Sequence, residues 1–354
     1  MPTLIPALVS AIVVLSLTPL VARIARRFGI VDRPGGRRVH ATVTPRLGGV
    51  AVIIAFFAGL AVAWPDVAPN FRPGQLAGFA AAGTFLLIVG VIDDKRGVPP
   101  IWQLASHVAV AVVLVAVGMG IDEISSPFGG KIPLNGAEIG VPGLAGHHLQ
   151  LPADLLTVAW VVLVINAVNW LDGLDGLAAG VGTISAITIA LLSVSAVVDQ
   201  PHVAILAMLL AGSLLGFLVY NFNPARIFLG TAGSTFVGFT LATLAIISGG
   251  KIATAILVLG FPILDSLAVI IRRTAGGGLP WQADATHLHH RLLGRGWSVR
   301  KTVLTIYAIS AGFGGLALLA GTTGYKFLAL IGMVGLMTIV LGRLSTGPAA
   351  GASQ

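Results

Sequence analysis

The sequence lacks cysteine and carries little charge. Without cysteine the chain can form neither disulfides nor thiolate metal sites. Only 10% of the 354 residues are charged, against roughly 25% in soluble globular domains. So few charges cannot cover the water-facing surface of a soluble protein of this length, which excludes soluble enzymes, secreted modules and disordered scaffolds. Acidic residues are scarcest, at 13 against 21 Lys and Arg.

Apolar residues make up 56% of the chain, and charged residues divide it into eleven apolar runs. A membrane-spanning helix needs about 20 such residues. The sequence therefore predicts an all-α polytopic membrane protein with about 11 transmembrane helices, forming a single domain over residues 1–343 with a short flexible tail at 344–354. The runs lie near residues 3–22, 47–64, 75–92, 101–120, 153–170, 177–198, 203–220, 234–250, 252–271, 302–320 and 326–342.

The basic residues predict the orientation of the chain, because Lys and Arg gather in cytoplasmic loops. With the N-terminus outside and the C-terminus inside, 17 of the 21 basic residues fall on the inner side. Membrane topology thus accounts for the net charge of +8, and we expect no nucleic-acid partner. The longest outer segment, residues 121–152, contains Asn135-Gly136, which predicts a small β-hairpin.

Carboxylates collect at the expected inner ends of two helices. Asp93 and Asp94 close the third run, and charged groups at membrane-helix ends are costly and tend to be functional. The alternative is an ordinary polar helix end balanced by Lys95 and Arg96.

Four polar residues follow one another at three-residue steps at the end of the fifth run and just after it. The spacing places Asn166 and Asn169 on one helical face. Carboxylates and amides stacked in this way suit a hard cation, a nucleobase edge or both, with a hydrogen-bonded helix cap as the alternative. These residues are Asn166, Asn169, Asp172 and Asp175.

Three other inner segments carry groups suited to phosphate. In the loop at 32–49, Arg residues lie among glycines; this pattern suits phosphate, although a basic loop on anionic lipid headgroups explains it better on the loop alone. The loop at 220–234 is rich in glycine and leads into the start of a helix, where free backbone amides can hold a phosphate or sugar phosphate. The segment at 281–293 holds three His within four residues, which favours contacts to a phosphorylated substrate over a transition-metal site. The candidate substrate-binding residues are Asn166 and, in these segments, Arg33, Arg38, His40, Arg46, Arg226, His287, His289, His290 and Arg291.

Together these segments resemble the polyprenyl-phosphate N-acetylhexosamine-1-phosphate transferases over about residues 1–320. The resemblance rests on Asp93-Asp94, the Asn-x-x-Asn-x-x-Asp-Gly-x-Asp-Gly run, Asn-Phe-Asn-Pro-Ala-Arg at 221–226, and His-x-His-His-Arg-Leu-Leu at 287–293. The histidine segment is similar to that of the WecA and TagO type. This implies transfer of N-acetylglucosamine 1-phosphate from UDP-N-acetylglucosamine to undecaprenyl or decaprenyl phosphate. UMP is released, in the first membrane step of a cell-envelope polysaccharide pathway.

The resemblance also implies roles. Asp93 corresponds to the residue that activates or orients the lipid phosphate, Asp94 to its partner, and Asp172 and Asp175 to the nucleotide end; these four are the candidate catalytic residues. Asn169 matches a ligand of Mg²⁺, the implied cofactor, with Mn²⁺ as the alternative. The implied partners are UDP-N-acetylglucosamine, the polyprenyl phosphate and the bilayer, with a homodimer left open. The implied location is the cytoplasmic membrane, multi-pass, with the active site facing the cytoplasm.

Thr231 departs from the family pattern. The family loop reads Phe-x-Gly-Asp-Ala-Gly-Ser, in which the Asp is a Mg²⁺ ligand, and Thr231 occupies that position. A hydroxyl is a weaker ligand for a hard cation than a carboxylate. A catalytically weakened member is therefore one alternative. A lipid-linked sugar transporter is another, which the one-sided placement of polar residues disfavours. Asp265 also matches a recurrent family position, to which we assign no role.

Overall fold

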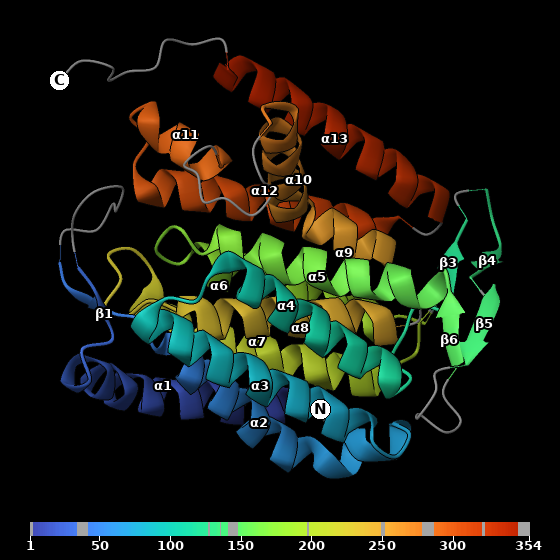
Figure 1. The fold of residues 1–354 in the computed structure, drawn as a ribbon, viewed down its shortest axis with the longest axis horizontal. Helices are drawn as coiled ribbons and strands as arrows, with labels where there is room; N and C mark the ends of the chain where they lie inside the picture. Colours follow the sequence, from blue (N-terminus) through green and yellow to red (C-terminus); the bar gives the residue numbers. More distant parts are fainter. Residues whose placement is uncertain are drawn as a thin grey trace.

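The computed structural model describes residues 3–33, 42–126, 128–134, 136–140, 148–196, 198–248, 252–277, 287–320 and 323–345. Its long helices run side by side in one bundle, with short strand pairs at the two ends (Figure 1). The helices are α1 (Leu4–Arg27), α2 (Gly48–Val67), η1 (Ala68–Asn70), α3 (Gln75–Arg96), α4 (Pro100–Ala116), α5 (Ala153–Leu171), α6 (Leu177–Ser193), α7 (Pro201–Asn221), α8 (Gly230–Ile247), α9 (Ile252–Val258), α10 (Gly260–Ala275), α11 (Leu288–Gly294), α12 (Val299–Leu319) and α13 (Thr323–Ser345).

Seven of the described helices are long and apolar enough to cross a membrane, or up to eight if α9 and α10 count as one span. The seven are α1, α2 with η1, α3, α5, α7, α8 and α12. Shorter apolar helices, α4, α6 and residues 324–340 of α13, lie where the other spans are expected. The chain is therefore a mostly helical, polytopic membrane protein.

The ninth expected span, residues 252–271, is not a straight helix. α9 and α10 meet at 81°. α9 has seven residues, which give about 10 Å of helix rise and so cover about a third of a 30 Å hydrocarbon core. Gly260 and Pro262 open α10, and a proline has no N–H to continue the hydrogen bonds of the preceding turn. α10 consequently stands across the bundle (Figure 1) and packs against α5, α12 and α13.

The segment at 121–152 differs from the single hairpin that Asn135-Gly136 predicts. It contains β3 (Glu123–Ser125), β4 (Lys131–Pro133), β5 (Ala137–Gly140) and β6 (His148–Leu151). β3 pairs with β4, and β5 pairs with β6, both antiparallel. The Asn-Gly dipeptide, whose Asn lies outside the described residues, thus connects strands of two separate pairs. Three residue pairs are in register between β3 and β4, and four between β5 and β6.

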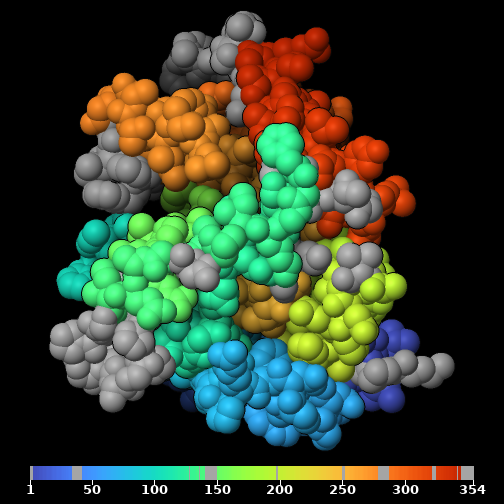
Figure 2. All heavy atoms as spheres, turned by 90° about the vertical axis from the view of Figure 1, so that its right-hand side faces the viewer, coloured from blue at the N-terminus to red at the C-terminus, as the bar shows by residue number. Residues whose placement is uncertain are grey.

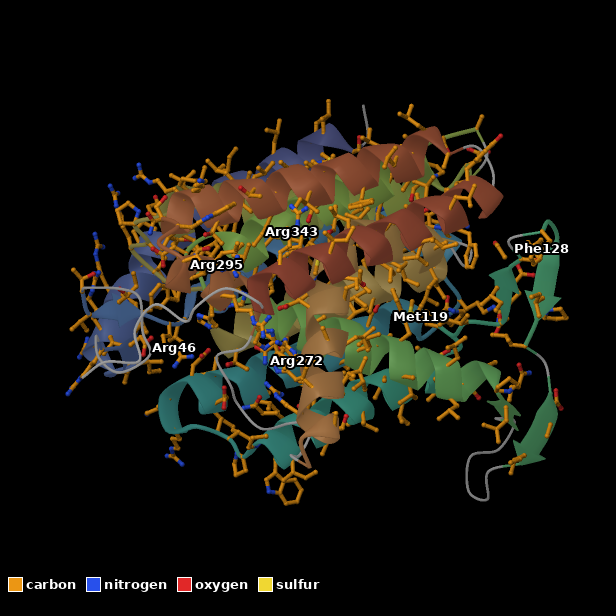
Figure 3. The ribbon with its side chains drawn as sticks, turned by 90° about the horizontal axis from the view of Figure 1, so that it is seen from above. Arg46, Met119, Phe128, Arg272, Arg295 and Arg343 are labelled. Carbon is orange, nitrogen blue, oxygen red and sulfur yellow. The ribbon has the colours of Figure 1, made fainter. Side chains whose placement is uncertain are left out.

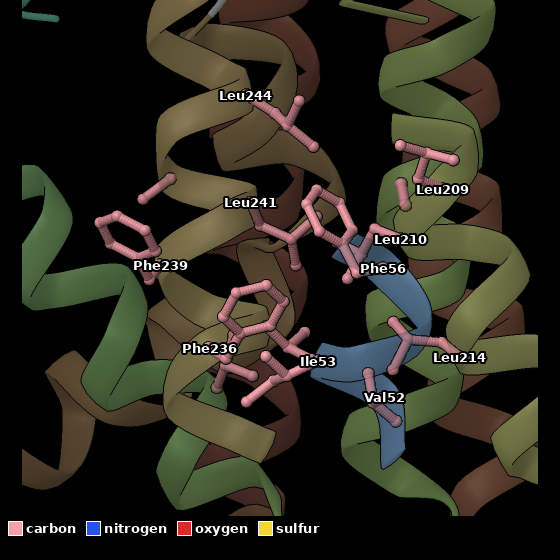
Figure 4. Close-up of a cluster of buried hydrophobic side chains, with 14 of the residues drawn as sticks. Val52, Ile53, Phe56, Leu209, Leu210, Leu214, Phe236, Phe239, Leu241 and Leu244 are labelled. Carbon is pink, nitrogen blue, oxygen red and sulfur yellow. The ribbon is translucent and has the colours of Figure 1, made fainter. Parts of the chain in front are cut away.

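α8 is the central helix, with 89% of its apolar window buried in the protein. Phe236 packs edge-on against Phe56 of α2, with ring centroids 5.5 Å apart (Figure 4). Near the start of α8 the two backbones nearly touch, because a Cβ on Gly49 would lie 2.1 Å from the amide nitrogen of Gly233. Small residues permit such close helix contacts in membranes. This packing fixes where α8 begins relative to α2.

The two ends of the bundle carry different groups. Figure 2 views the end with β3–β6, which cross the middle of that face in green. In Figure 3, Arg46 and Phe128 lie at opposite ends of the bundle. Arg46 follows β2 (Thr44–Pro45), which pairs with β1 (Val31–Asp32). The candidate active site lies at the end that carries Arg46.

Candidate active site

Asp94, in the last turn of α3, caps the first turn of α8. Its carboxylate accepts hydrogen bonds from the backbone amides of Thr231, at 3.0 Å, and Ala232, at 3.4 Å. Leu229, which precedes α8, provides no side-chain cap of its own. The free amides of a helix start attract anions, so a carboxylate from another helix satisfies them. The Arg46 Nε lies 3.6 Å from the same carboxylate.

Asp93 faces the same helix start through the side chain of Thr231. The Thr231 hydroxyl donates to Asp93 Oδ2 at 2.6 Å. The other oxygen accepts from the Val98 amide at 2.7 Å and from Gln103 Nε2 at 2.8 Å. Asp93 and Asp94 therefore join α3, the start of α4 and the start of α8, and both contact Thr231.

Gly230 makes this arrangement sterically feasible. Its φ is +75°, a conformation that residues with a Cβ rarely adopt. A Cβ here would lie 2.1 Å from the Arg46 carbonyl oxygen and 2.6 Å from Asp94 Oδ2. The loop from β2 and the carboxylate can approach the helix start only because this side chain is absent.

Asn169, near the end of α5, joins the same cluster. Its Oδ1 accepts a hydrogen bond from Ser234 Oγ at 2.7 Å, and Ser234 lies one turn into α8. Asn169, Thr231 and Asp93 thus bring an amide, a hydroxyl and a carboxylate oxygen to the first turn of α8. Within the described part of the chain, no group of three or more Asp, Glu or His side chains forms a ready-made metal cluster.

Asp172, directly after α5, lies among packed helix ends. This loss of hydration raises its pKa well above the ordinary 3.8; the charge of Arg46 opposes the shift, and Asp94 and Asp175 add to it. The folded protein therefore holds a proton on this carboxyl more tightly than the unfolded chain does.

We expect Asp172→Asn to gain stability relative to the parent protein as the pH rises from acid to neutral. Because the folded pKa is raised, ionising Asp172 lowers the free energy of unfolding as the pH rises from 3.8 through the folded value. Thermal midpoints of both proteins in detergent, measured from pH 4 to 8, test this. A parent that gains stability over the Asn variant as the pH rises would contradict it.

Asp175 shapes the neighbouring loop. Its Oδ2 accepts hydrogen bonds from Asn223 Nδ2, at 2.8 Å, and from the Ala225 amide, at 3.0 Å. Asp175 therefore holds the loop between α7 and α8 against the end of α5.

The histidine segment reaches the site through Gly173. His289 is fully buried, and its Nε2 would lie 2.7 Å from a Cβ on Gly173. Burial lowers the pKa of His289 well below 6.5, and His290 and His287 lower it further. The ring is thus neutral at pH 7, with one donor and one acceptor nitrogen. Neither nitrogen has a hydrogen-bond partner among the described residues.

We expect Gly173→Ala to displace His289 and to raise the KM for the nucleotide sugar about tenfold, equivalent to about 1.4 kcal/mol. The physical reason is the 2.7 Å approach, too short for a methyl group beside a buried ring. Steady-state kinetics with varied nucleotide sugar measure the change. Gly312→Ala, in α12 with open space at its Cβ, is the control. Equal KM values for the two variants would refute the contact.

The other candidate residues have different surroundings. Asn166 Nδ2 contacts His107 Nδ1 at 3.1 Å, so this amide joins α5 to α4. The side chains of Arg33 and Arg226 are exposed. Arg38 and His40 lie outside the described residues, although β1 and β2 hold the two ends of their loop. His290 packs on His289 with ring centroids 4.4 Å apart, and Arg291 follows in α11.

Several contacts could not be found from the sequence. Gln103, Ser234 and Gly173 touch candidate residues that are distant in the chain. Single polar or small residues in apolar runs give no signal of such contacts. Asp265 was recognisable as a carboxylate inside an apolar run, which is a signal of function.

Comparisons with known proteins identify the family of this chain. Residues 76–249 match the family described as glycosyl transferase family 4. A probable undecaprenyl-phosphate N-acetylglucosaminyl 1-phosphate transferase of Bacillus subtilis is 32% identical over 85% of this chain and 80% of its own length. A decaprenyl-phosphate N-acetylglucosaminephosphotransferase of Mycolicibacterium smegmatis is 35% identical over 85% of this chain and 77% of its own length. A phospho-N-acetylmuramoyl-pentapeptide-transferase of Desulforudis audaxviator is 32% identical over 87% of this chain and 95% of its own length.

The fold and these relatives define a membrane-embedded transferase. The chain belongs to glycosyl transferase family 4.

Proposed function

We propose that this protein transfers N-acetylglucosamine 1-phosphate from UDP-N-acetylglucosamine to a polyprenyl phosphate and releases UMP. The observation that carries the proposal is the convergence of four chain segments at one end of the bundle. The end of α3 meets the start of α8 through Thr231, the end of α5 meets α8 through Ser234, and Gly173 meets His289. The names of the B. subtilis and M. smegmatis relatives support the choice of substrates.

A site at the end of a membrane bundle suits this pair of substrates. The acceptor is a lipid that stays in the bilayer, and the donor is a charged nucleotide sugar that stays in water. Their phosphates can meet only where apolar helices end. A transporter would instead place its polar groups near the middle of the membrane.

The reaction replaces one phosphoanhydride by another, so catalysis depends on positioning and charge neutralisation. Asp93 orients the acceptor phosphate, which is already largely dianionic at pH 7 because its second pKa is about 6. Asp94 holds the start of α8 in place and brings Arg46 beside it. Asp172 and Asp175 lie toward the nucleotide, and the histidines contact the diphosphate and the sugar.

The donor set fits Mg²⁺. Asn169 Oδ1, Thr231 Oγ1 and the carboxylate of Asp93 are hard oxygen ligands around one helix turn, and Mg²⁺ commonly binds one or two carboxylates together with substrate phosphates. Bound there, the ion would neutralise phosphate charge. The lack of a second carboxylate at position 231 makes this a weaker site than the family pattern provides.

The proposal includes the membrane topology: eleven spans, with the bent pair α9 and α10 counted as one broken span, the N-terminus outside, and the active site at the cytoplasmic face. The basic residues support this orientation, because Arg46 lies at the same end as the site and the β3–β6 segment at the opposite end (Figure 3).

Exchange of radiolabelled UMP into UDP-N-acetylglucosamine tests the proposed reaction. Purified protein in detergent receives polyprenyl phosphate, UDP-N-acetylglucosamine, Mg²⁺ and labelled UMP, and label in the nucleotide sugar is the expected result. Omission of the lipid is the control, since exchange requires the acceptor. No exchange with all components present would overturn the proposal. A panel of UDP-sugars in the same assay defines the donor.

A further inference from the structure

Helix α10 carries a buried carboxylate that contacts the histidine segment. The roles proposed above do not use this carboxylate. Asp265 lies in the second turn of α10 and is 2% exposed; His287 is 6% exposed. A charged group in a membrane protein interior is costly unless it is hydrogen-bonded. Its partners should therefore show why it is there.

Both oxygens of Asp265 bind the start of α11. Oδ2 lies 2.8 Å from His287 Nδ1, and Oδ1 accepts the Leu288 amide at 2.9 Å. His287 is the residue that precedes α11, and it provides no side-chain cap. Asp265 therefore supplies both the cap of this helix and the partner of its preceding histidine.

The contact decides which nitrogen of His287 carries the proton. An ionised carboxylate has only acceptors, so Nδ1 must be the N–H donor to Oδ2. Nε2, across the ring, is then the remaining polar atom of His287. A carboxylate behind a functional histidine fixes its tautomer and its ring orientation in many sites.

The neighbouring rings fix the plane of His287. His289 stacks on it at 12°, with centroids 5.7 Å apart, and Trp170 lies at 5.8 Å on α5. Arg273 of α10 lies 5.6 Å over the Trp170 ring. A 180° flip of the ring about χ2 keeps this plane but exchanges its two sides. The bond from Nδ1 to Asp265 Oδ2 holds one side in place and so fixes where Nε2 points.

We propose that Asp265 is a positioning residue for the transfer reaction, holding His287 as the Nδ1–H tautomer so that Nε2 faces the nucleotide sugar. The inference rests on the proposed function for its substrate, but not for the tautomer. It also assigns a purpose to the bend before α10, which brings this carboxylate beside the histidine segment.

Asp265→Asn is the decisive variant. The amide oxygen can still accept from the Leu288 amide, so the helix cap is retained. The amide NH₂ can only donate, so His287 Nδ1 must become an acceptor and the proton must move to Nε2. We expect the ring ¹⁵N spectrum of His287, assigned with His287→Gln, to change from the Nδ1–H to the Nε2–H pattern. We expect kcat/KM for UDP-N-acetylglucosamine to fall about 10- to 100-fold.

Asp154→Asn is the matched control. Asp154 also accepts a backbone amide, that of Gln150 at 2.7 Å, but it lies at the opposite end of the bundle and has no histidine partner among the residues that the structure describes. This variant should change neither the His287 spectrum nor the transfer rate. In the double variant of Asp265→Asn with His287→Gln, transfer should be no slower than with His287→Gln alone, because contacting residues that act together are not additive.

The spectrum is recorded without substrate, so it separates this inference from the proposed function. An Nε2–H tautomer in the parent protein, or an unchanged tautomer in Asp265→Asn, overturns the inference whatever the activity. A reversed tautomer with unchanged affinity for UDP-N-acetylglucosamine, measured by titration calorimetry, also overturns it. A reversed tautomer with weakened binding but no UMP exchange in the parent supports the positioning and refutes the reaction.

Discussion

Thr231→Asp is expected to raise Mg²⁺-dependent UMP release by at least about tenfold, or about 1.4 kcal/mol in the activation barrier. The hydroxyl of Thr231 already lies 2.6 Å from Asp93 Oδ2, so an added carboxylate falls in the cluster that Asn169 completes. An anionic ligand attracts a divalent cation more strongly than a neutral hydroxyl does. UMP release measured against Mg²⁺ concentration should show both a higher rate and a lower half-saturating concentration.

The same variant should be less stable without metal. The new carboxylate adds a third negative charge beside Asp93 and Asp94 and removes the hydrogen bond from Thr231, so repulsion is relieved only when a cation binds. Thermal midpoints with EDTA and with Mg²⁺ should differ more for the variant than for the parent protein. Thr231→Asn, of equal size and no charge, is the control. No gain in rate and no Mg²⁺-dependent stabilisation would show that the metal is held elsewhere.

Gly230→Ala is expected to abolish most transfer activity. The new Cβ would lie 2.1 Å from the Arg46 carbonyl oxygen and 2.6 Å from Asp94 Oδ2, so the loop and the carboxylate must both move. A displacement of 1 Å among positioned groups costs on the order of 100-fold in rate. Left-handed backbone at a residue with a Cβ adds about 1–3 kcal/mol of strain. UMP exchange and thermal midpoints measure the two effects.

Gly74→Ala distinguishes the effect of backbone strain from the effect of steric overlap. Gly74 has a φ of +91°, but a Cβ there meets nothing within 4 Å. This control should therefore lose stability without a comparable loss of transfer once the protein is folded. If both variants lose activity equally, the close approach at Gly230 has no special part in the site.

The positions of the helices could be predicted because apolar runs of about 20 residues have few other uses. The bend between α9 and α10 could not, since Gly260 and Pro262 are both tolerated inside straight membrane helices when neighbours satisfy the backbone. The strands at 121–152 were predictable as a region. Their pairing was not, because strands of three or four residues depend on contacts that the local sequence does not encode.

The candidate site was predictable in its parts but not in its connections. Asp93, Asn169 and Thr231 belong to motifs that can be read one at a time. That Thr231 donates to Asp93, or that Asn166 turns away to His107, depends on how α3, α4, α5 and α8 rotate against one another. Rotation is set by packing contacts such as Gly49 against Gly233, which a hydropathy pattern does not reveal.

The cap that Asp94 places on α8 has a consequence for biogenesis. The Thr231 amide and the carboxylate that accepts it are 137 residues apart in the chain. During synthesis α3, which carries the Asp94 carboxylate, therefore enters the bilayer long before the amides that it caps are made. α8, nearly surrounded by protein, cannot satisfy its first amides until the earlier helices have gathered around it. Formation of the reactive centre is thus a late step in the assembly of the membrane fold, and a nascent chain released before α8 would hold the acidic motif without a competent centre.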